Sequence, residues 1–487
     1  MPPVQDLTAD RPLAPAVAVP GVVSRRRVVL AVLVLTALSF LSPSAPTYDP
    51  WAWTIWGREI IHLDLSTVDG PSWKPLPMLV TPIFALFGGL APDLWLFVAR
   101  AAALVSVLVV FRLVRRLGGG VAGATAAAVA YAVAGWTVRN GLMGNSEGLL
   151  VACVLGAFER HLAGHRRMAF VLALGAGLLR PEVWPFLGLY GLWLAWRMPS
   201  ARALVAAGFA SLPALWLLPE WWGSGDPLRA MTRAQQPVPG TPGSSANPVG
   251  AVLERFEAML TPSIWAGLAA LAVVLVLLLR GRAHRPGTPG APGPREAAAA
   301  LALLAGAVLL VAEVALMSSR GGFTGGTRYL ILPAAMVIAL SGLGAGWALR
   351  AAAGGRASRR AVALGLVAVA ALAFAAPSLA GLLPTVRQVR YQARVVDDLA
   401  TAVHRAGGRE RLLACGDPYT GPFEVPIVAW QLHTHTSRVS LTPRTPAVLF
   451  RTPTDPVKGV PGKHARILAA THYWRIRGVC RAGPGAR

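Results

Sequence analysis

Long apolar runs separated by short polar segments dominate this chain. Residues 266–279 and 297–316, the latter interrupted only by Glu313, are too long and too sparsely charged for helices in water. About 20 apolar residues in a helix cross the ~30 Å hydrocarbon core, and a helix satisfies its own backbone polar groups in lipid. The pattern predicts a mainly α, polytopic transmembrane bundle of about eleven spans. The spans are expected at about 28–45, 94–111, 121–137, 147–160, 168–180, 183–197, 203–219, 263–280, 296–317, 328–349 and 361–384.

One apolar stretch, residues 76–90, does not fit this scheme. It is about 15 residues long, contains Pro77 and Pro82 and ends in two glycines, and as a full span it would place the arginines at 112–116 on the outer side. We therefore predict an interfacial or re-entrant helix. A second such helix is predicted at 51–63. Its tryptophans suit the aromatic belt at the lipid headgroups: Trp51, Trp53 and Trp56.

Composition and charge distribution support a membrane protein and argue against nucleic-acid binding. Hydrophobic residues make up 54% of the chain, charged residues 14%, and the formal net charge is +24. Only Lys74, Lys458 and Lys463 among the 46 basic residues are lysines, and many arginines lie in short loops between apolar runs. This is the positive-inside pattern, which places the N-terminus in the cytoplasm of a multi-pass cell-membrane protein.

The spans divide the chain into three parts. Residues 1–27 are a cytoplasmic N-terminal tail. Residues 28–384 are the transmembrane domain, with a structured external loop at 46–93 and a second one at 220–262. Residues 385–487 are expected to form a small extracytoplasmic α/β domain. A Gly- and Pro-rich cytoplasmic linker is expected at 282–294.

The predicted C-terminal domain has local features of its own. Residues 386–405 predict a surface helix, and residues 412–414, 426–430 and 438–441 predict short strands. It contains two of the three cysteines, Cys415 and Cys480. A disulfide between them is one alternative if the domain is outside, and free thiols are the other.

Acidic residues number only 22, so their positions carry information. Asp49 follows the first predicted span, where it could be a general base for a hydroxyl, a ligand for a hard divalent cation, or the N-cap of a helix starting at Pro50. Glu147 lies where one span turns into the next. A carboxylate at this depth is costly unless it is paired or faces a wet cavity. The alternative is a helix cap with Arg139 as its ion partner.

The segment from Arg180 to Glu182 interrupts an apolar stretch of about 30 residues, and Pro181 breaks the helix there. The two charges could neutralise one another, or Arg180 could bind a lipid phosphate through both guanidinium nitrogens. Arg100, inside the second span, could snorkel to the surface.

Two later loops add polar groups at the outer surface. Asp226 follows a Trp-Trp-Gly-Ser-Gly sequence, and Arg320 and Arg328 enclose a glycine-rich turn. This turn could cradle an anion through its backbone N–H groups, or it could be a plain hairpin between spans. We find no convincing Walker A sequence, zinc-ligand spacing, Gly-x-Ser-x-Gly elbow or dinucleotide fingerprint.

The ordered set of these motifs over about residues 25–350 resembles the GT-C superfamily of membrane glycosyltransferases. It is most similar to the bacterial cell-envelope mannosyl- and arabinofuranosyltransferase-like members, in which an acidic residue and two juxtamembrane helices follow the first span. The similar elements are Tyr48-Asp49, Lys74-Pro-Leu-Pro, Gly144-Asn-Ser-Glu147, Leu179-Arg-Pro-Glu182, Gly225-Asp-Pro-Leu228 and Thr327-Arg-Tyr-Leu330. The sequence departs from the family where Pro50 replaces the second acidic residue and Arg229-Ala230 replaces Pro-Asn.

The resemblance implies transfer of a sugar from a polyprenyl-phosphate donor to a cell-envelope glycan or lipid acceptor on the outer face. Asp49 would be the catalytic base, and arginines such as Arg180 or Arg328 would hold the leaving phosphate. Further substrate-binding residues would be Lys74, Glu147, Glu182, Asp226 and Tyr329. No nucleotide sugar or ATP is needed. No cofactor is assigned, and a divalent cation (Mg²⁺, Mn²⁺ or Ca²⁺) is left open. Two alternative functions are a lipid or solute transporter and a non-catalytic envelope-assembly protein.

Overall fold

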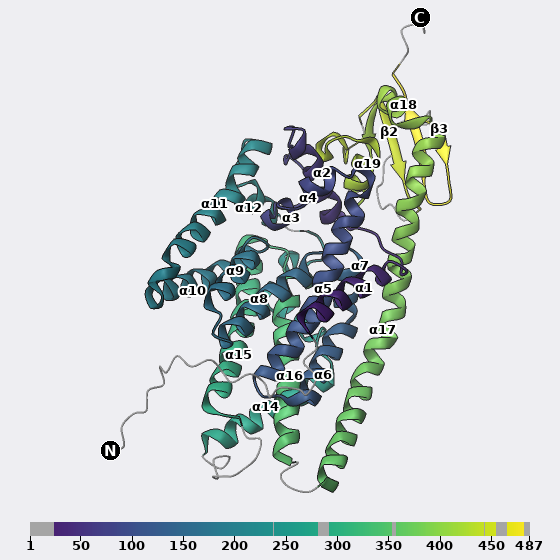
Figure 1. The fold of residues 1–487 in the computed structure, drawn as a ribbon. Coiled ribbons are helices and arrows are strands. Elements are labelled where there is room, and N and C mark those ends of the chain that lie inside the picture. The colour runs from purple at the N-terminus through teal and green to yellow at the C-terminus, as the bar shows by residue number, and fades with distance from the viewer. Residues whose placement is uncertain are drawn as a thin grey trace, which may run out of the picture.

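The computed structural model describes residues 24–236, 238–280, 292–352, 357–442, 444–453 and 465–481. The N-terminal tail up to residue 23, and most of the linker predicted at 282–294, lie outside these ranges. The described chain is a bundle of helices with a small α/β unit at one end, which we call the domain end (Figure 1). The long helix α17 (Ala357–Arg405) runs along the side of the bundle to this unit.

A helix coincides with each predicted span, although the helices differ in length. Five are long and apolar enough to cross a membrane on their own, which confirms a multi-pass membrane protein. They are α5 (Ala91–Arg116), α11 (Arg202–Ser224), α14 (Pro262–Leu279), α15 (Pro294–Gly321) and α16 (Thr327–Ala352). Helices α6 (Gly120–Val133) and α7 (Gly135–Leu142) make a sixth crossing if the pair, bent by 57°, is one span. The count of about eleven stays a prediction.

The remaining spans predicted before α17 correspond to shorter helices. These are α1 (Arg25–Ser39), α8 (Glu147–Leu162), α9 (Arg166–Gly177) and α10 (Trp184–Arg197). Single 3-10 turns join some of them: η2 (Pro181–Val183) and η3 (Pro199–Ala201).

Helix α16 is the centre of the bundle. Its most apolar 18-residue segment is 94% buried, and small residues let its neighbours approach closely. A Cβ atom on Gly342 would lie 2.6 Å from the Cβ of Ala127 in α6, and one on Gly344 would lie 2.6 Å from the backbone nitrogen of Leu271 in α14. Helix α16, which carries Arg328 in its first turn, is therefore closely packed in its middle part.

The loop predicted at 46–93 contains four short elements at the domain end: α2 (Tyr48–Ile61), α3 (Pro75–Met78), α4 (Thr81–Ala85) and η1 (Gly88–Leu90). The stretch 76–90 is divided into short pieces and is not one long helix, which agrees with the prediction that it is not a full span. It exposes large apolar side chains such as Leu86 and Phe87. The prediction that the tryptophans of α2 lie in the aromatic belt at the lipid headgroups was wrong. All three are buried, because Trp51 packs on Trp430, Trp53 on Trp95 and Trp56 on Trp73.

The loop predicted at 220–262 is hydrogen-bonded to the loop at 46–93. It contains α12 (Arg229–Ala234), η4 (Pro242–Ser244) and α13 (Pro248–Glu257). The Arg229 guanidinium donates to the carbonyl oxygens of Gly70 (3.1 Å) and Pro71 (2.9 Å) and pairs with Glu220 (3.4 Å). This clasp fixes the segment that leads into Lys74.

The C-terminal unit is a four-stranded mixed sheet with helices, which agrees with the predicted α/β class. Its elements after α17 are α18 (Gly408–Cys415), β1 (Asp417–Tyr419), α19 (Val425–Leu432), η5 (Thr436–Arg438), β2 (Ala447–Arg451), β3 (Arg466–Ala470) and β4 (Arg475–Val479). The strand order is β1-β2-β4-β3. Strands β1 and β2 are parallel, with Pro418 opposite Val448, whereas β4 is antiparallel to both neighbours.

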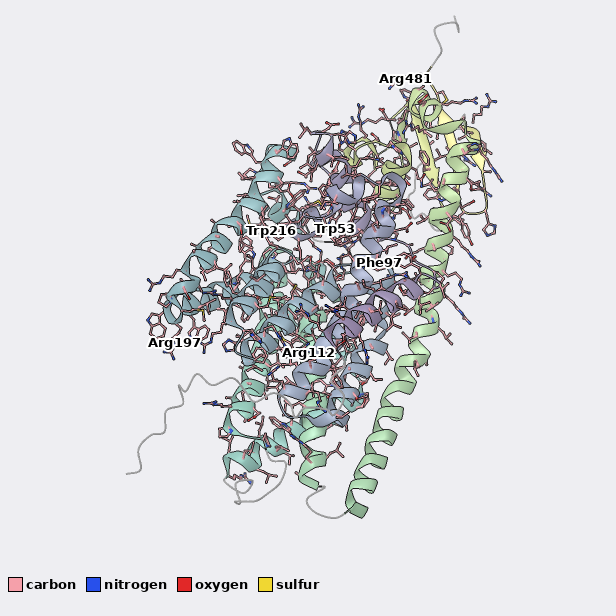
Figure 2. All side chains as sticks on the ribbon, viewed as in Figure 1. Trp53, Phe97, Arg112, Arg197, Trp216 and Arg481 are labelled. Carbon is pink, nitrogen blue, oxygen red and sulfur yellow. A yellow bond between two sulfur atoms is a disulfide. The ribbon has the colours of Figure 1, made fainter. Side chains whose placement is uncertain are left out.

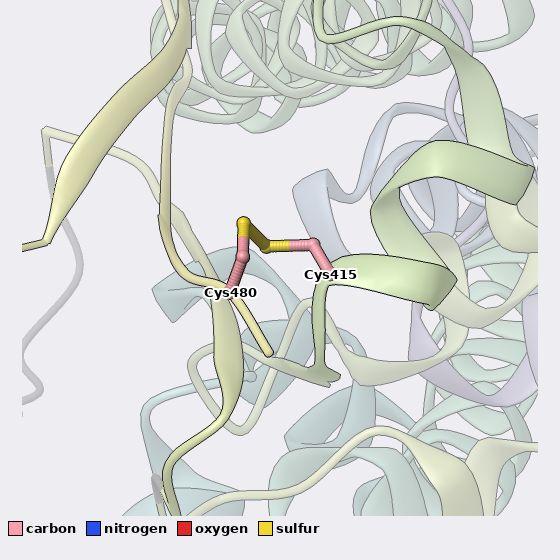
Figure 3. The surroundings of a disulfide bond; sticks show 2 residues. All are labelled: Cys415 and Cys480. Carbon is pink, nitrogen blue, oxygen red and sulfur yellow. A yellow bond between two sulfur atoms is a disulfide. The ribbon is translucent and has the colours of Figure 1, made fainter. Parts of the chain in front are cut away.

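The predicted local structure of this unit was correct only for the helix at 386–405, which is the end of α17. Residues 412–414 and 426–430 are helical, and 438–441 contributes only one bridge, Ser440 to Tyr419. Short apolar runs do not distinguish strands from buried helices. Of the two alternatives for the cysteines, the structure has the disulfide, between Cys415 at the end of α18 and Cys480 after β4 (Figure 3).

Candidate active site

Charged side chains from five separate elements meet at the domain end of the bundle. They are Asp49 (α2), Lys74 (before α3), Glu147 (α8), Arg180 (before η2) and Arg328 (α16). We call these residues, together with Glu182 and Tyr329, the polar cluster. Predicted substrate-binding residues far apart in the sequence therefore lie together.

Arg328 is the hub of the polar cluster. Its Nη1 lies 2.9 Å from Asp49 Oδ2, and its Nε lies 2.7 Å from Glu147 Oε1. Arg180 Nη2 contacts the same Glu147 oxygen at 2.9 Å, and Lys74 Nζ lies 3.6 Å from Asp49. Arg328 thus bridges the two carboxylates, and each carboxylate has one further cation beside it.

Asp49 occupies the first turn of α2, where a carboxylate interacts favourably with the helix dipole. The N-cap of this helix is Thr47, so the prediction of Asp49 as a cap was wrong. The Thr47 hydroxyl donates to Asn145 (2.7 Å), and the Asn145 amide donates to Asn140 (2.9 Å). This chain of side chains ties the start of α2 to the turn that precedes Glu147.

Glu147 is the first residue of α8 and is 1% exposed. The N-cap is Ser146, and the carboxylate is paired with Arg180 and Arg328 rather than with Arg139, the partner expected from the sequence. A buried carboxylate needs such partners because an isolated charge is costly there.

Pro181 ends the run of backbone hydrogen bonds from α9 and turns Arg180 towards the polar cluster. The Arg180 guanidinium lies 4.2 Å from the ring centroid of Tyr329, and its Nη1 is 3.9 Å from Glu182 Oε1. The predicted Arg180–Glu182 pair therefore exists, but the shorter contact of Arg180 is to Glu147.

Electrostatics hold Asp49 ionised and make Lys74 easy to deprotonate. Burial would raise the pKa of Asp49, but Arg328 and Lys74 overcome it and lower the pKa to about 2. Burial lowers the pKa of Lys74 to about 7, helped by Arg180 and Arg328 and opposed by Asp49 and Glu147. An additional anion at this site would stabilise the charged form of Lys74.

Three buried polar atoms of the polar cluster have no hydrogen-bond partner among the described residues: Glu147 Oε2, Glu182 Oε2 and Arg328 Nη2. Leaving a buried polar atom unpaired costs about 1–3 kcal/mol. Two acceptors and one donor are therefore available for the hydroxyl and phosphate oxygens of a ligand.

The arrangement does not fit a divalent cation. In the part of the chain that the structure describes, no group of three or more His, Cys, Asp or Glu side chains could hold a metal ion. The two carboxylates that share Arg328 are Asp49 and Glu147. Its guanidinium group would repel a cation bound between them. The cation ligand role considered for Asp49 is not supported by these neighbours.

Other predicted polar groups lie apart from the polar cluster. Asp226 is exposed, and its Oδ1 accepts from the backbone N–H of Leu228 (2.9 Å), so it stabilises a turn. Arg100 does not snorkel, because it is 3% exposed and donates to Ser39 in α1 (2.7 Å). Sequence reasoning missed Trp53, whose ring centroid lies 5.1 Å from Lys74 Nζ.

An apolar cavity of about 560 Å³ begins beside the polar cluster. Val183 follows Glu182 directly, and Leu332 lies one helical turn beyond Arg328; both line the cavity. From there it extends between α8–α10 and α15–α16 to Trp193 near the opposite end of α10. Its position in the spans suits a flexible apolar chain.

Comparison with protein-family models and with curated proteins found no match. The structure is similar to the crystal structure of ArnT from Cupriavidus metallidurans in the apo state, with a TM-score of 0.54, 15% identity, and coverage of 93% of this chain and 98% of that one. It is also similar to ArnT from the same organism bound to undecaprenyl phosphate, with a TM-score of 0.55, 15% identity, and coverage of 92% and 96%. At this identity the likeness shows the fold alone, and it confirms the predicted polytopic helical bundle.

Proposed function

We propose that this chain is a membrane glycosyltransferase that moves a sugar from a polyprenyl-phosphate donor to a cell-envelope acceptor on the outer face. The observation that carries the proposal is the polar cluster, in which Asp49 and Glu147 face Lys74, Arg180 and Arg328. A base next to a set of phosphate-binding cations is what displacement of a lipid phosphate requires.

The arginine distribution supports an external position for the domain end. Arg112 and Arg197 lie farther from the C-terminal unit than Trp53 does (Figure 2), and both are at helix ends opposite to the polar cluster. Short arginine-rich segments face the cytoplasm. With this orientation the N-terminus is cytoplasmic and the C-terminal unit is extracytoplasmic.

A lipid-linked donor fits the site in two ways. Its phosphate would replace the Asp49 carboxylate at Lys74 and Arg328 and could take the unpartnered Arg328 Nη2. Its polyprenyl chain would enter the apolar cavity that begins at Val183. The ArnT neighbour bound to undecaprenyl phosphate supports this choice of lipid.

The reaction we infer is a single displacement, which inverts the anomeric centre. The acceptor oxygen forms a bond to the anomeric carbon while the bond from that carbon to the phosphate oxygen breaks. Asp49 takes the acceptor proton, and the lipid phosphate leaves held by Arg180 and Arg328. Asp49 is a weak base while Arg328 and Lys74 contact it, so a donor phosphate that engages those cations would raise its pKa and activate it.

The remaining members of the polar cluster would orient the substrates. The free oxygens of Glu147 and Glu182 can accept hydrogen bonds from sugar hydroxyls. Tyr329 stacks on Arg180 and keeps its guanidinium in place.

The proposal is tested by transfer from polyprenyl-phosphate-linked radiolabelled mannose and arabinose in proteoliposomes, with total envelope lipids and glycans as acceptors. The wild-type protein should transfer label, and D49N should reduce the rate at least about 100-fold, since general-base catalysis contributes about 10²–10⁴-fold. D226N is the matched control, because it neutralises an exposed carboxylate outside the polar cluster, and it should retain the wild-type rate. Full activity of D49N would disprove the role of the base, and countertransport of donor without transfer would favour a transporter.

A further inference from the structure

Two polar hollows lie side by side on the C-terminal unit, outside the polar cluster. The first, of about 410 Å³, lies between the end of α2 and the segment after α19, and is lined by residues that include Arg58, Asp64 and His433. The second, of about 260 Å³, lies on the unit itself and is lined by residues that include Asp417, Thr442 and Arg444. Arg438 lines both hollows, so they adjoin one another, and together we call them the groove.

The contact between α2 and the C-terminal unit is centred on His435. Its Nδ1 lies 2.8 Å from Glu59 Oε1, and its Nε2 lies 3.1 Å from Asp64 Oδ2. Arg58 Nη2 donates to the Thr434 carbonyl oxygen at 3.1 Å. These contacts hold the C-terminal unit on α2 and fix the shape of the first hollow.

One feature of the groove is unexplained by folding alone. Arg58 Nη1 is buried and has no hydrogen-bond partner among the residues with described positions. The left-handed backbone of Leu63 and His433 (φ 56° and 52°) has a folding reason, because these residues end helices α2 and α19. The unpaired donor of Arg58 therefore points to a ligand group in the first hollow.

The chemistry of the groove favours a polyhydroxylated ligand over an anion. Arg58, Arg438 and Arg444 supply donors, whereas Asp64 and Asp417 supply acceptors with side chains 74% and 64% exposed. Each sugar hydroxyl both donates and accepts a hydrogen bond, so a glycan can use both sets. A phosphate or polyanion only accepts and would be repelled by the two aspartates.

The position of the groove suits the far part of an acceptor chain. Arg58 follows Asp49 by nine residues in α2, which is about 14 Å along a helix. The segment from Asp64, in the first hollow, leads directly to Lys74 in the polar cluster.

We infer that the groove binds the acceptor glycan at units behind the one that reacts. This inference rests on the proposed function for its meaning, but glycan binding can be measured without transfer. It assigns the C-terminal unit the task of selecting a glycan acceptor.

The test measures binding of neutral polysaccharides (dextran, yeast mannan and arabinogalactan) and of the polyanions heparin and polyglutamate to the full-length protein in nanodiscs, by biolayer interferometry. At least one neutral polysaccharide should bind, and R438A or R444S should weaken that binding about tenfold, the loss of roughly one charge-assisted hydrogen bond. R466A is the matched control, because it removes an exposed arginine from β3, outside both hollows. Unchanged melting temperatures would show that all variants fold.

Several results would overturn the inference. These are no binding of any neutral polysaccharide, equal binding by wild type and R438A, and binding of polyanions only. The D49N variant separates this inference from the proposed function. If D49N still binds the polysaccharide but wild type shows no transfer, the groove stands and the proposed reaction fails.

Discussion

Replacing Lys74 with methionine should change the pH dependence of phosphate binding in a defined way. Lys74 is 7% exposed, and its pKa is lowered to about 7 by burial and by Arg180 and Arg328. It is therefore charged below pH 7 and neutral above it. Methionine keeps the apolar stem and removes the charge, so K74M represents the neutral form at every pH.

The expected size of the effect follows from linkage. A charge-assisted hydrogen bond from Lys74 to a phosphate contributes about 2 kcal/mol, which raises the pKa of bound Lys74 by about 1.5 units. The wild-type protein should then bind about 30-fold more tightly than K74M at pH 6, but only about 1.3-fold more tightly at pH 9. The ionisation of the ligand cancels in this ratio, because both proteins meet the same ligand.

The assay is microscale thermophoresis of the labelled protein in nanodiscs with farnesyl phosphate, a short polyprenyl phosphate, between pH 6 and pH 9. The variant R197Q removes an exposed arginine at the far end of α10 (Figure 2) and should follow the wild-type curve. A wild-type to K74M affinity ratio that is constant over this range, or that rises with pH, would refute the assigned role of Lys74.

Three further predictions concern the scaffold that holds the site. C415S opens a disulfide that spans 65 residues, and should destabilise the C-terminal unit by about 4 kcal/mol, seen as faster limited proteolysis of that unit. R229M leaves buried Glu220 without its cation and should lower the free energy of unfolding by about 3–5 kcal/mol. The melting temperature should recover in part in E220Q/R229M. Full stability of R229M would contradict the role of Arg229 in holding the two loops together. G342L should disrupt the contact of α16 with α6 and lower the melting temperature, whereas G306L, where a Cβ meets nothing within 4 Å, should not.

The sequence allowed the charged members of the site to be identified because charges are scarce beside the apolar spans. Asp49, Glu147, Arg180 and Arg328 each interrupt or border an apolar run, where an ionisable residue is costly unless it has a partner or a function. The identity of the partners could not be predicted. Asp49 and Arg328 are 279 residues apart, and only the packing of α16 at the centre of the bundle brings them together.

The sequence also could not predict that the tryptophans of α2 are buried, or that the short apolar run at 425–432 is a helix. The tryptophans of α2 have apolar neighbours whether they face lipid headgroups or a protein core, and the C-terminal unit that covers Trp51 lies nearly 400 residues further on. The run at 425–432 has strand-like residues, but it packs as helix α19. In both cases tertiary contacts decide the outcome.

The most direct test of the account is an electron cryo-microscopy structure of D49N in nanodiscs with a bound polyprenyl-phosphate sugar. The account predicts the phosphate within hydrogen-bond distance of Lys74 and Arg328, the anomeric carbon facing residue 49, and the polyprenyl chain in the apolar cavity beside Val183. A lipid phosphate bound instead among the arginines at the other end of the bundle, such as Arg112 and Arg116, would contradict it.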